Sequence, residues 1–315
     1  SNTGTAAVLI PVVIGVAAKS GFTRSRLLMP LVFAAALGGN LSLIGAPGNL
    51  IAQSALQNIG SGFGFFEYAK VGLPMLVCGI LYFLTIGYKF LPNNSNSSEV
   101  GSIGEQRDYS HVPRWKQILS LVVLIATILG MIFEKQTGIS LTVAGCIGAL
   151  VLVITGVLTE KQAYKAIDSQ TIFIFGGTLA LAKALEMTGA GKLVADQVIG
   201  LLGNNSSPFM LLVVVFALSV VMTNFMSNTA TVALLVPVSL SIAAGMGADP
   251  RAVLMATVIG SSCAYATPIG MPANMMVLSA GGYKFVDYAK SGIPLIIVST
   301  IVSLILLPIL FPFHP

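Results

Sequence analysis

The sequence predicts an all-α polytopic membrane protein. Of its 315 residues, 55% are hydrophobic and only 9% are charged, whereas soluble domains carry about 25% charged residues. The apolar residues form runs of about 20 residues, the length of a membrane-spanning helix, rather than the short alternating segments of an outer-membrane barrel. This composition argues against a soluble enzyme and against a disordered chain.

The apolar runs follow one another along the whole chain. They cover residues 5–18, 27–59, 71–91, 117–133, 139–158, 170–187, 208–243, 252–280 and 292–311. Runs 27–59 and 252–280 are too long for one span, and Gly and Pro interrupt them at 45–48 and 267–272, so we predict two broken transmembrane helices. We predict two re-entrant hairpins, one at run 5–18 and one at run 208–243. The second of these runs is interrupted at 223–224 and 227–229. The other runs predict single spans.

The distribution of basic residues supports this topology. Segment 92–116 is polar and rich in Ser and Asn, as expected for a solvated loop, and we place it in the cytoplasm. The cytoplasmic basic residues are then Lys19, Arg24, Arg26, Lys89, Arg107, Arg114, Lys116, Lys161, Lys165, Lys284 and Lys290; the external ones are Lys70, Lys135, Lys192 and Arg251, with Lys183 at the border. Eleven of the 16 basic residues therefore lie inside, as the positive-inside rule requires.

Three sequence blocks occur twice in the same order. SNTGTAAVLIPVV at 1–13 matches SNTATVALLVPVS at 227–239, Gly45-x-Pro47-x-Asn49 matches Gly270-x-Pro272-x-Asn274, and FFEYAKVGLP at 65–74 matches FVDYAKSGIP at 285–294. The predicted topology puts matched blocks on opposite sides of the membrane, which is the inverted repeat of many secondary transporters. Spans precede the second copy but not the first, so we expect about 110 residues to be missing before Ser1.

The repeated motifs contain the polar residues that could bind a solute. Each Ser-Asn-Thr tip offers side-chain oxygens and free N–H groups at a helix start, and each Gly-x-Pro-x-Asn break offers unpaired carbonyls. These oxygens suit a hard cation such as Na⁺, while half-helix N-termini favour an anion. Helix capping and chain punctuation are the alternative interpretation of a single motif. Two tips, each matched with its own break, favour a binding function.

Two further observations concern the coupling ion. Thr223 lies one helical turn before Ser227 and could add a hydroxyl to the second site, or it could bond its own helix backbone. No Asp or Glu falls in the middle of a predicted span, whereas a proton-coupled carrier usually needs an intramembrane carboxylate. The sequence therefore favours charge-neutral cation sites.

These residues resemble the divalent anion/sodium symporter family of the ion transporter superfamily. The resemblance rests on the two SNT tips, LIGAPGN at 43–49, SCAYATPIGMPAN at 262–274 and IDSQTIFIFGGTLALAKALEMTGAG at 167–191. It implies an elevator-type transporter. Its transport domain would comprise 1–91 and 204–315, its dimerising scaffold 117–203, and its cytoplasmic linker 92–116.

The resemblance also implies the site residues. One sodium site would comprise Ser1, Asn2 and Gly45, and the other Thr223, Ser227, Asn228 and Gly270. The substrate contacts would be Asn2, Thr3, Asn228, Thr229, Pro47, Pro272 and Met271. The chain departs from the family pattern at Met271, where dicarboxylate carriers tend to have a small hydroxyl residue. It also departs in the first break, at Ala46, where Thr or Ser is frequent, and at Gly48, where Pro is frequent. Both departures, the one at Met271 and the one in the first break, remove polar contacts.

The expected function is sodium-coupled symport of a small anion, such as a dicarboxylate or sulfate, across the cytoplasmic membrane. We expect a homodimer in the lipid bilayer, with Na⁺ as coupling ion, no other cofactor and no nucleic-acid partner. Proton-coupled transport of an anion or oxyanion is the first alternative, and an ion channel is the second. The sequence contains no nucleophile–base pair, metal cluster or phosphate loop that would indicate an enzyme.

Overall fold

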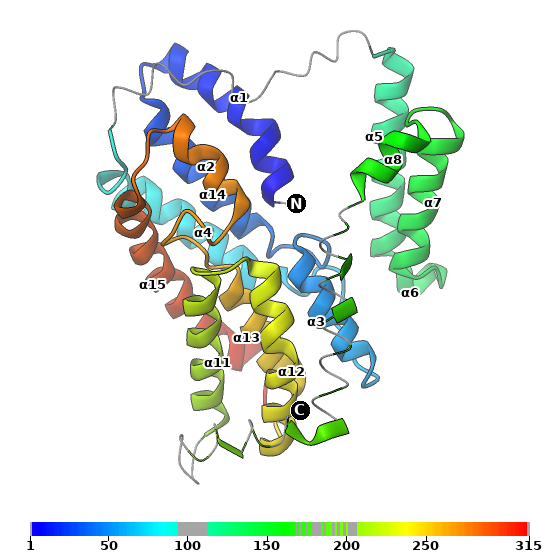
Figure 1. Cartoon of the computed structure of the whole chain (residues 1–315), viewed down its shortest axis with the longest axis vertical. Coiled ribbons are helices and arrows are strands. Elements are labelled where there is room, and N and C mark those ends of the chain that lie inside the picture. Colours follow the sequence, from blue (N-terminus) through cyan, green and yellow to red (C-terminus); the bar gives the residue numbers. More distant parts are fainter. Residues whose placement is uncertain are drawn as a thin grey trace. The chain divides into compact units, whose positions relative to one another are not determined.

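The computed structural model describes residues 2–93, 112–167 and 207–313 continuously, and scattered positions between 168 and 206 (Figure 1). Every regular element among these residues is a helix, so the all-α prediction is confirmed for this part of the chain. The chain divides into two compact units, one formed by residues 1–104 with 173–315 and the other by residues 105–172.

Several helices have the character of membrane spans. Helices α1 (Asn2–Ser20), α5 (Arg114–Ile132), α12 (Asn228–Met246) and α15 (Phe285–Leu310) are long and apolar enough to cross a bilayer. Helices α4 (Ala69–Thr85), α7 (Leu141–Ile154) and α11 (Pro208–Thr223) are apolar but shorter. Along α15, an isoleucine at every fourth position from 293 to 309 is exposed, which is the surface expected of a helix in lipid.

The smaller unit comprises α5, α6 (Glu134–Thr137), α7 and α8 (Glu160–Ala166). Helices α5 and α7 pack through small residues: Gly148 lies against Thr127, and Gly130 lies against Ala144. Small residues let helix backbones approach closely, as is common between helices in a membrane. Helix α5 begins at Arg114, inside the segment predicted as a polar linker at 92–116, because Pro113 forms its N-cap.

The larger unit contains two series of helices in the same order. The first is α1, α2 (Arg24–Gly38), α3 (Pro47–Gln57) and α4, followed by the short 3₁₀ helix η1 (Gly87–Lys89). The second is α12, α13 (Pro250–Ser261), α14 (Pro272–Ala280) and α15, preceded by α11. Helices α1 and α12 both have 19 residues, and each contains a proline at its tenth position, Pro11 and Pro237.

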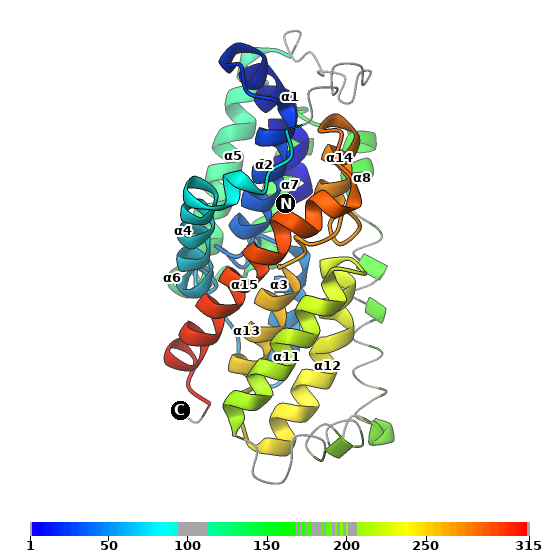
Figure 2. The ribbon, with the colours of Figure 1, turned by 90° about the vertical axis from the view of Figure 1, so that its left-hand side faces the viewer.

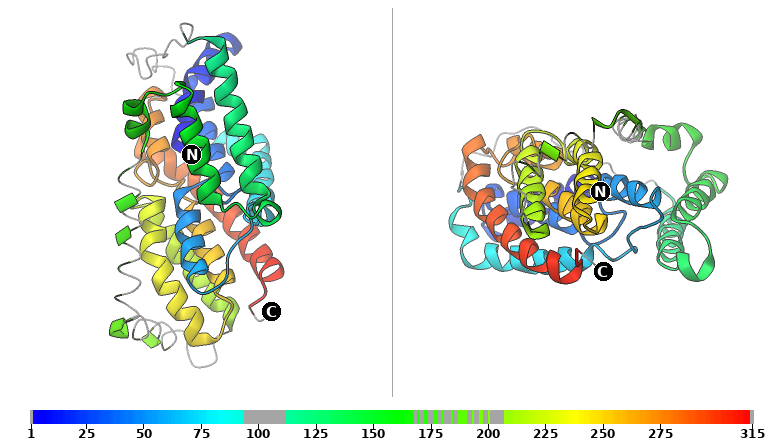
Figure 3. Two further views of the ribbon diagram at one scale, coloured as in Figure 1. Left: turned by 90° about the vertical axis from the view of Figure 1, so that its right-hand side faces the viewer. Right: turned by 90° about the horizontal axis from the view of Figure 1, so that it is seen from below.

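The two series pack against each other within this unit. Helix α4 runs beside α15, and α1 contacts α2 and α14 (Figure 2). Helix α3 lies along α12, where Gly48 meets Val232, and the pair is visible in the side view of Figure 3. The long α15 and α4 lie side by side again in the view from below (Figure 3). Tyr68, Tyr265 and Tyr288 are fully buried among these helices.

The helix interruptions are wider than the sequence indicated. The non-helical segments are 39–46 and 262–271, whereas the Gly and Pro residues predicted breaks at 45–48 and 267–272. The difference arises because Pro47 and Pro272 are the first residues of α3 and α14, a position where proline is favoured. The prolines therefore restart the helices. The tip between α11 and α12 spans residues 224–227.

Candidate functional site

The tip between α11 and α12 meets the break between α13 and α14 through a cluster of oxygen atoms. One end of the Asn228 side-chain amide lies 2.8 Å from Thr223 Oγ1. The same end lies 3.2 Å from the carbonyl oxygens of both Ser261 and Gly270. Thr223 Oγ1 also donates a hydrogen bond to the Ser261 carbonyl, and Thr223 is fully buried. Thr223, Asn228 and Gly270, three residues of one predicted sodium site, are therefore in contact.

The Asn228 amide can face this cluster with either its nitrogen or its oxygen. With the amide nitrogen facing the cluster, Asn228 donates to the surrounding oxygens. An amide turned by half a rotation presents its Oδ1 instead. That oxygen would join the Thr223 hydroxyl and the two carbonyls as donors to a hard cation. Divalent cations are usually held by carboxylates, whereas this donor set is neutral, so a monovalent cation matches it better. Among the described residues, no group of three or more His, Cys, Asp or Glu forms a metal site.

Gly270 allows the tip to approach the break. A Cβ at this position would collide with the Thr223 carbonyl oxygen and lie 3.3 Å from Asn224 Cα. Any larger residue would push the tip away, and the Asn228 amide would lose its contact with the Gly270 carbonyl. The glycine of the second Gly-x-Pro-x-Asn motif is thus a requirement of close backbone packing.

Asn224, which is not among the residues predicted from the sequence, fixes the tip to the break. Its Nδ2 donates to the Cys263 carbonyl at 3.1 Å, and its Oδ1 accepts from Ala266 N–H at 2.9 Å. Thr267 Oγ1 donates to the Asn224 carbonyl at 2.5 Å. The Thr-Asn pair at 223–224 was the only sequence signal of this role. Ser261 gave no signal, because it contributes a backbone carbonyl.

The remaining residue of this predicted sodium site, Ser227, has a local role in the structure. Its Oγ accepts a hydrogen bond from Ala230 N–H at 3.2 Å and caps α12. This is the helix-capping interaction that the sequence offered as the alternative. Thr229 follows on the first turn of α12 and is half-buried.

The first-copy residues Asn2, Gly39 and Gly45 also lie together. A Cβ added to Gly39 would lie 2.6 Å from Asn2 Oδ1, and one added to Gly45 would collide with the Gly39 carbonyl. Of the predicted sodium residues, Asn2 and Gly45 are therefore close to one another. Ser1 falls outside the described residues. Thr3 is half-buried on the first turn of α1.

Two of the predicted substrate residues meet across the repeat. The Asn2 amide Nδ2 lies 3.9 Å from the Met271 sulfur, a weak hydrogen bond between residues 269 positions apart. Met271 is only 2% exposed and immediately precedes α14. Pro47 and Pro272 occupy the first turns of α3 and α14. The tip of the first copy thus contacts the break of the second.

The asparagines of the two Gly-x-Pro-x-Asn motifs hold their breaks in the same way. Asn49 Nδ2 donates to the carbonyls of Gly39 and Ser42 at 3.1 and 2.9 Å. Asn274 Nδ2 donates to the equivalent carbonyls, those of Ala264 and Thr267, at 2.9 and 3.0 Å. Each break therefore forms a loop around one side-chain amide. The other backbone carbonyls of the break are not bound by this amide and are available to other partners.

A cavity of about 350 Å³ lies beside the first tip. Its lining residues are Asn2, Thr5, Leu9, Leu31, Ala34, Ala35, Gly38, Gly39 and Gly45. In the second copy the position equivalent to Ala35 is Gly260, which packs against Phe216 and Ser219 of α11. The position equivalent to Gly45 is Gly270, which packs against Thr223 of α11. The cavity thus lies at the surface whose equivalent in the second copy is covered by α11.

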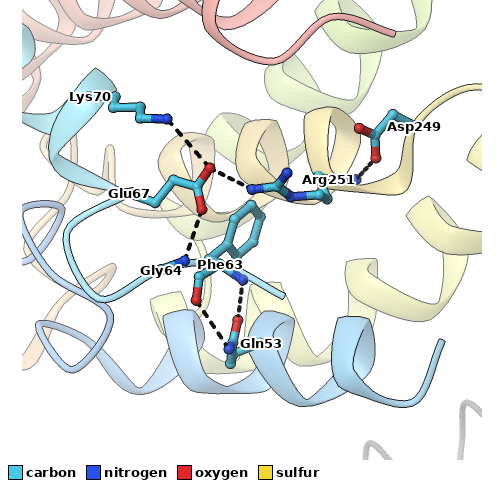
Figure 4. Close-up of polar contacts among 7 residues, drawn as sticks. All are labelled: Gln53, Phe63, Gly64, Glu67, Lys70, Asp249 and Arg251. Atoms are coloured by element: carbon cyan, nitrogen blue, oxygen red, sulfur yellow. Dashed lines mark hydrogen bonds and ion pairs between the residues drawn. The ribbon is translucent and has the colours of Figure 1, made fainter. Parts of the chain in front are cut away.

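A charged cluster lies at the start of α13, the end opposite Ser261 (Figure 4). Arg251 Nη2 is 2.5 Å from Glu67 Oε1, and Lys70 Nζ is 3.6 Å from the same oxygen. The second Glu67 oxygen accepts from Gly64 N–H, and Asp249 caps α13 through Arg251 N–H. These charges neutralise one another and join the segment before α4 to α13, which is a structural role.

Comparison with known proteins identifies relatives among transporters. The sequence profile of the citrate transporter family (CitMHS) matches residues 1–257 and 128–314. The chain is 31% identical over 309 residues to the uncharacterized transporter MJ0672 of Methanocaldococcus jannaschii, covering 96% of this chain and 68% of that protein. An uncharacterized transporter of Haemophilus influenzae is 28% identical over 319 residues, covering 96% and 67%. The sodium-dependent dicarboxylate transporter SdcS of Staphylococcus aureus is 25% identical over 309 residues, covering 92% and 59%.

Proposed function

Since the chain belongs to the citrate transporter family, we propose that it is a secondary active transporter that couples the entry of Na⁺ to the uptake of a small anion across the cytoplasmic membrane. The observation that carries this proposal is the neutral oxygen cluster of Thr223, Asn228, Ser261 and Gly270. It suits a monovalent cation and contains no group that would titrate near neutral pH. The relative SdcS is named as sodium-dependent, which agrees with this choice of ion.

The anion would bind where the two tips approach the breaks. Helices α1, α3, α12 and α14 all begin there, so the positive ends of four helix dipoles lie at this place. Helix N-termini favour negative charge, and a cation bound in the neighbouring oxygen cluster would add to that field. In this proposal Asn2, Thr3, Asn228, Thr229, Pro47, Pro272 and Met271 line the anion site. Binding of Na⁺ and anion would then be mutually favourable because each compensates the other's charge.

The carrier would be built from two copies of one structural unit with opposite orientations in the membrane, an inverted repeat. The matching order of α1–α4 and α12–α15, and the matching hydrogen bonds of Asn49 and Asn274, support a common structural plan for the two copies. The distribution of basic residues supports opposite orientations in the membrane. We extend the proposal to an elevator-type movement of the larger unit's helices relative to a dimeric scaffold.

Transport in liposomes tests the proposal. The full-length protein is reconstituted, and uptake of labelled citrate, succinate and sulfate is measured under an inward Na⁺ gradient and under an equal K⁺ gradient. We expect concentrative uptake of one of these anions with Na⁺ only, and exchange of labelled for unlabelled anion without a gradient. Uptake driven equally by K⁺ would contradict sodium coupling. A steady ionic current without solute exchange would indicate a channel instead of a carrier.

A further inference from the structure

A single side-chain hydrogen bond joins the two helix breaks. Asn40 Nδ2, in the break at 39–46, donates to Ser262 Oγ, in the break at 262–271, at 2.7 Å. The two residues are 222 positions apart in sequence. Asn40 is 0% exposed and Ser262 is 5% exposed, so water does not compete for this bond. A buried hydrogen bond of this kind fixes the distance between the two backbone segments.

Each partner is adjacent in the chain to one candidate cation cluster. Asn40 directly follows Gly39, which contacts the Asn2 amide and Gly45. Ser262 directly follows Ser261, whose carbonyl faces Asn228 and Thr223. A shift of the backbone at either cluster therefore displaces one end of the Asn40–Ser262 bond. The bond is thus a direct mechanical link between the two clusters.

Packing alone does not account for an amide and a hydroxyl at this position. The Ser262 hydroxyl accepts from Asn40 and donates its proton to the Ile259 carbonyl at 2.7 Å. The Asn40 Oδ1 atom is buried without a partner in the described part of the chain, which is a costly arrangement. Two apolar side chains could fill this space without that cost.

We propose that the Asn40–Ser262 bond couples the two cation sites, so that Na⁺ binding at one cluster favours Na⁺ binding at the other. The inference rests on the proposed function, because it requires cations at both clusters. Neither side chain contacts the ion in this scheme. Asn40 and Ser262 are positioning residues that transmit the geometry of one break to the other, and the coupling is reciprocal by thermodynamic necessity.

Equilibrium Na⁺ binding to the purified full-length protein tests the coupling. Radiolabelled ²²Na⁺ is titrated in the absence of any anion, which makes the readout independent of the transported substrate. The variants are Ser262→Ala and the double variant Asn40→Leu/Ser262→Ala, which removes both partners and leaves no amide N–H unpaired. Ser262→Thr keeps the hydroxyl. Ser239→Ala is the matched control, because it removes another buried hydroxyl bond, that of Ser239 to Thr257 at 2.9 Å.

We expect a Hill coefficient of about 1.5–2 for the wild type, falling to about 1 in both bridge variants. The amount of Na⁺ bound at saturation should stay unchanged, which a general folding defect would not allow. Ser262→Thr and Ser239→Ala should behave like the wild type. A wild-type Hill coefficient of 1, or an unchanged coefficient in the double variant, would overturn the coupling and leave sodium-driven transport standing. Absence of any saturable Na⁺ binding would overturn both proposals.

Discussion

At the scale of single residues, side-chain amides organise the candidate site. Asn49 and Asn274 each hold two carbonyls of a break, and Asn224 ties the tip at 224–227 to the second break. Asn228 differs from these three because the end of its amide that faces two carbonyls, those of Ser261 and Gly270, also faces a hydroxyl, that of Thr223. An amide has both a donor and an acceptor end, so in the proposed function Asn228 would donate to these oxygens in the empty site and turn its Oδ1 toward a bound cation.

Asn228→Ala should therefore weaken the response to Na⁺. The change removes one donor to the cation, and a hydrogen-bond-type interaction with a charged group is worth about 1.5–3 kcal/mol, or roughly 10- to 100-fold in affinity. The measurement is the Na⁺ concentration that gives half-maximal anion uptake. Asn58→Ala, at the exposed C-terminal end of α3, is the matched control and should leave this value unchanged. If neither variant changes this Na⁺ concentration, Asn228 has no role in cation binding and serves only to start α12.

Met271→Thr should change the preference among anions. Met271 contacts Asn2 and offers no strong hydrogen bond, whereas a threonine hydroxyl could bond an additional carboxylate oxygen. One such bond is worth about 0.5–1.5 kcal/mol, so we expect the ratio of succinate to sulfate uptake efficiency to rise several-fold. Paired uptake curves at fixed Na⁺ measure the ratio. Met275→Thr, at an exposed position of α14, should leave it as in the wild type.

At the scale of elements, short interruptions of apolar helices create the polar surfaces. The breaks bring backbone carbonyls and helix starts into the middle of otherwise apolar elements, which is tolerated only where protein surrounds them. The close fit of tip and break depends on glycine, because a Cβ of residue 270 would lie only 2.5 Å from the Thr223 carbonyl oxygen. The geometry of the oxygen cluster is therefore a property of two packed elements and not of one motif.

Gly270→Ala should separate the α11–α12 tip from the second break. Overpacking of this kind typically costs about 1–3 kcal/mol, and we expect both a lower melting temperature and loss of its increase with Na⁺. Thermal unfolding in Na⁺ and in K⁺ measures the two effects. Gly15→Ala, in a part of α1 with no atom near the added methyl group, should be neutral or slightly stabilising. Full retention of sodium stabilisation in Gly270→Ala would contradict the assigned cluster.

At the scale of the whole molecule, the two series of helices share one plan. Their elements have the same order, their prolines restart helices at equivalent positions, and Tyr68 and Tyr288 both donate to the carbonyl of the motif asparagine. The family that the tips and breaks resembled was confirmed by the comparisons. The opposite orientation of the two copies in the membrane remains a prediction of the basic-residue distribution.

Thiol labelling tests that orientation at two equivalent positions. Ser20 and Met246 end α1 and α12, and the inverted repeat places them on opposite sides of the membrane. We expect a membrane-impermeant maleimide to label Met246→Cys in intact cells, and to label Ser20→Cys only after permeabilisation. The unchanged chain, with Cys78, Cys146 and Cys263, gives the background. Labelling of both positions from the same side would exclude an inverted repeat.

The sequence by itself determined the helical class, the order of the two copies and the motifs that interrupt their helices. These features are local or periodic: apolar runs have the length of a membrane span, and Gly and Pro change backbone geometry where they stand. Asn2, Asn228, Gly45 and Gly270 were predicted as site residues in this way, because each belongs to a short motif that occurs twice.

Only the tertiary structure decided which groups meet. The Ser261 carbonyl carries no signature in its side chain, the Asn2–Met271 contact joins residues 269 positions apart, and the Asn40–Ser262 bond links the two breaks. The motif of an amide opposite a serine does not recur in the other copy, since Tyr265 and Leu37 stand at the positions equivalent to Asn40 and Ser262. Repeat symmetry could therefore not reveal the bond. It exists because the packing of α1 to α4 against α11 to α15 brings the two breaks into contact, and packing between distant segments depends on all of their surfaces at once.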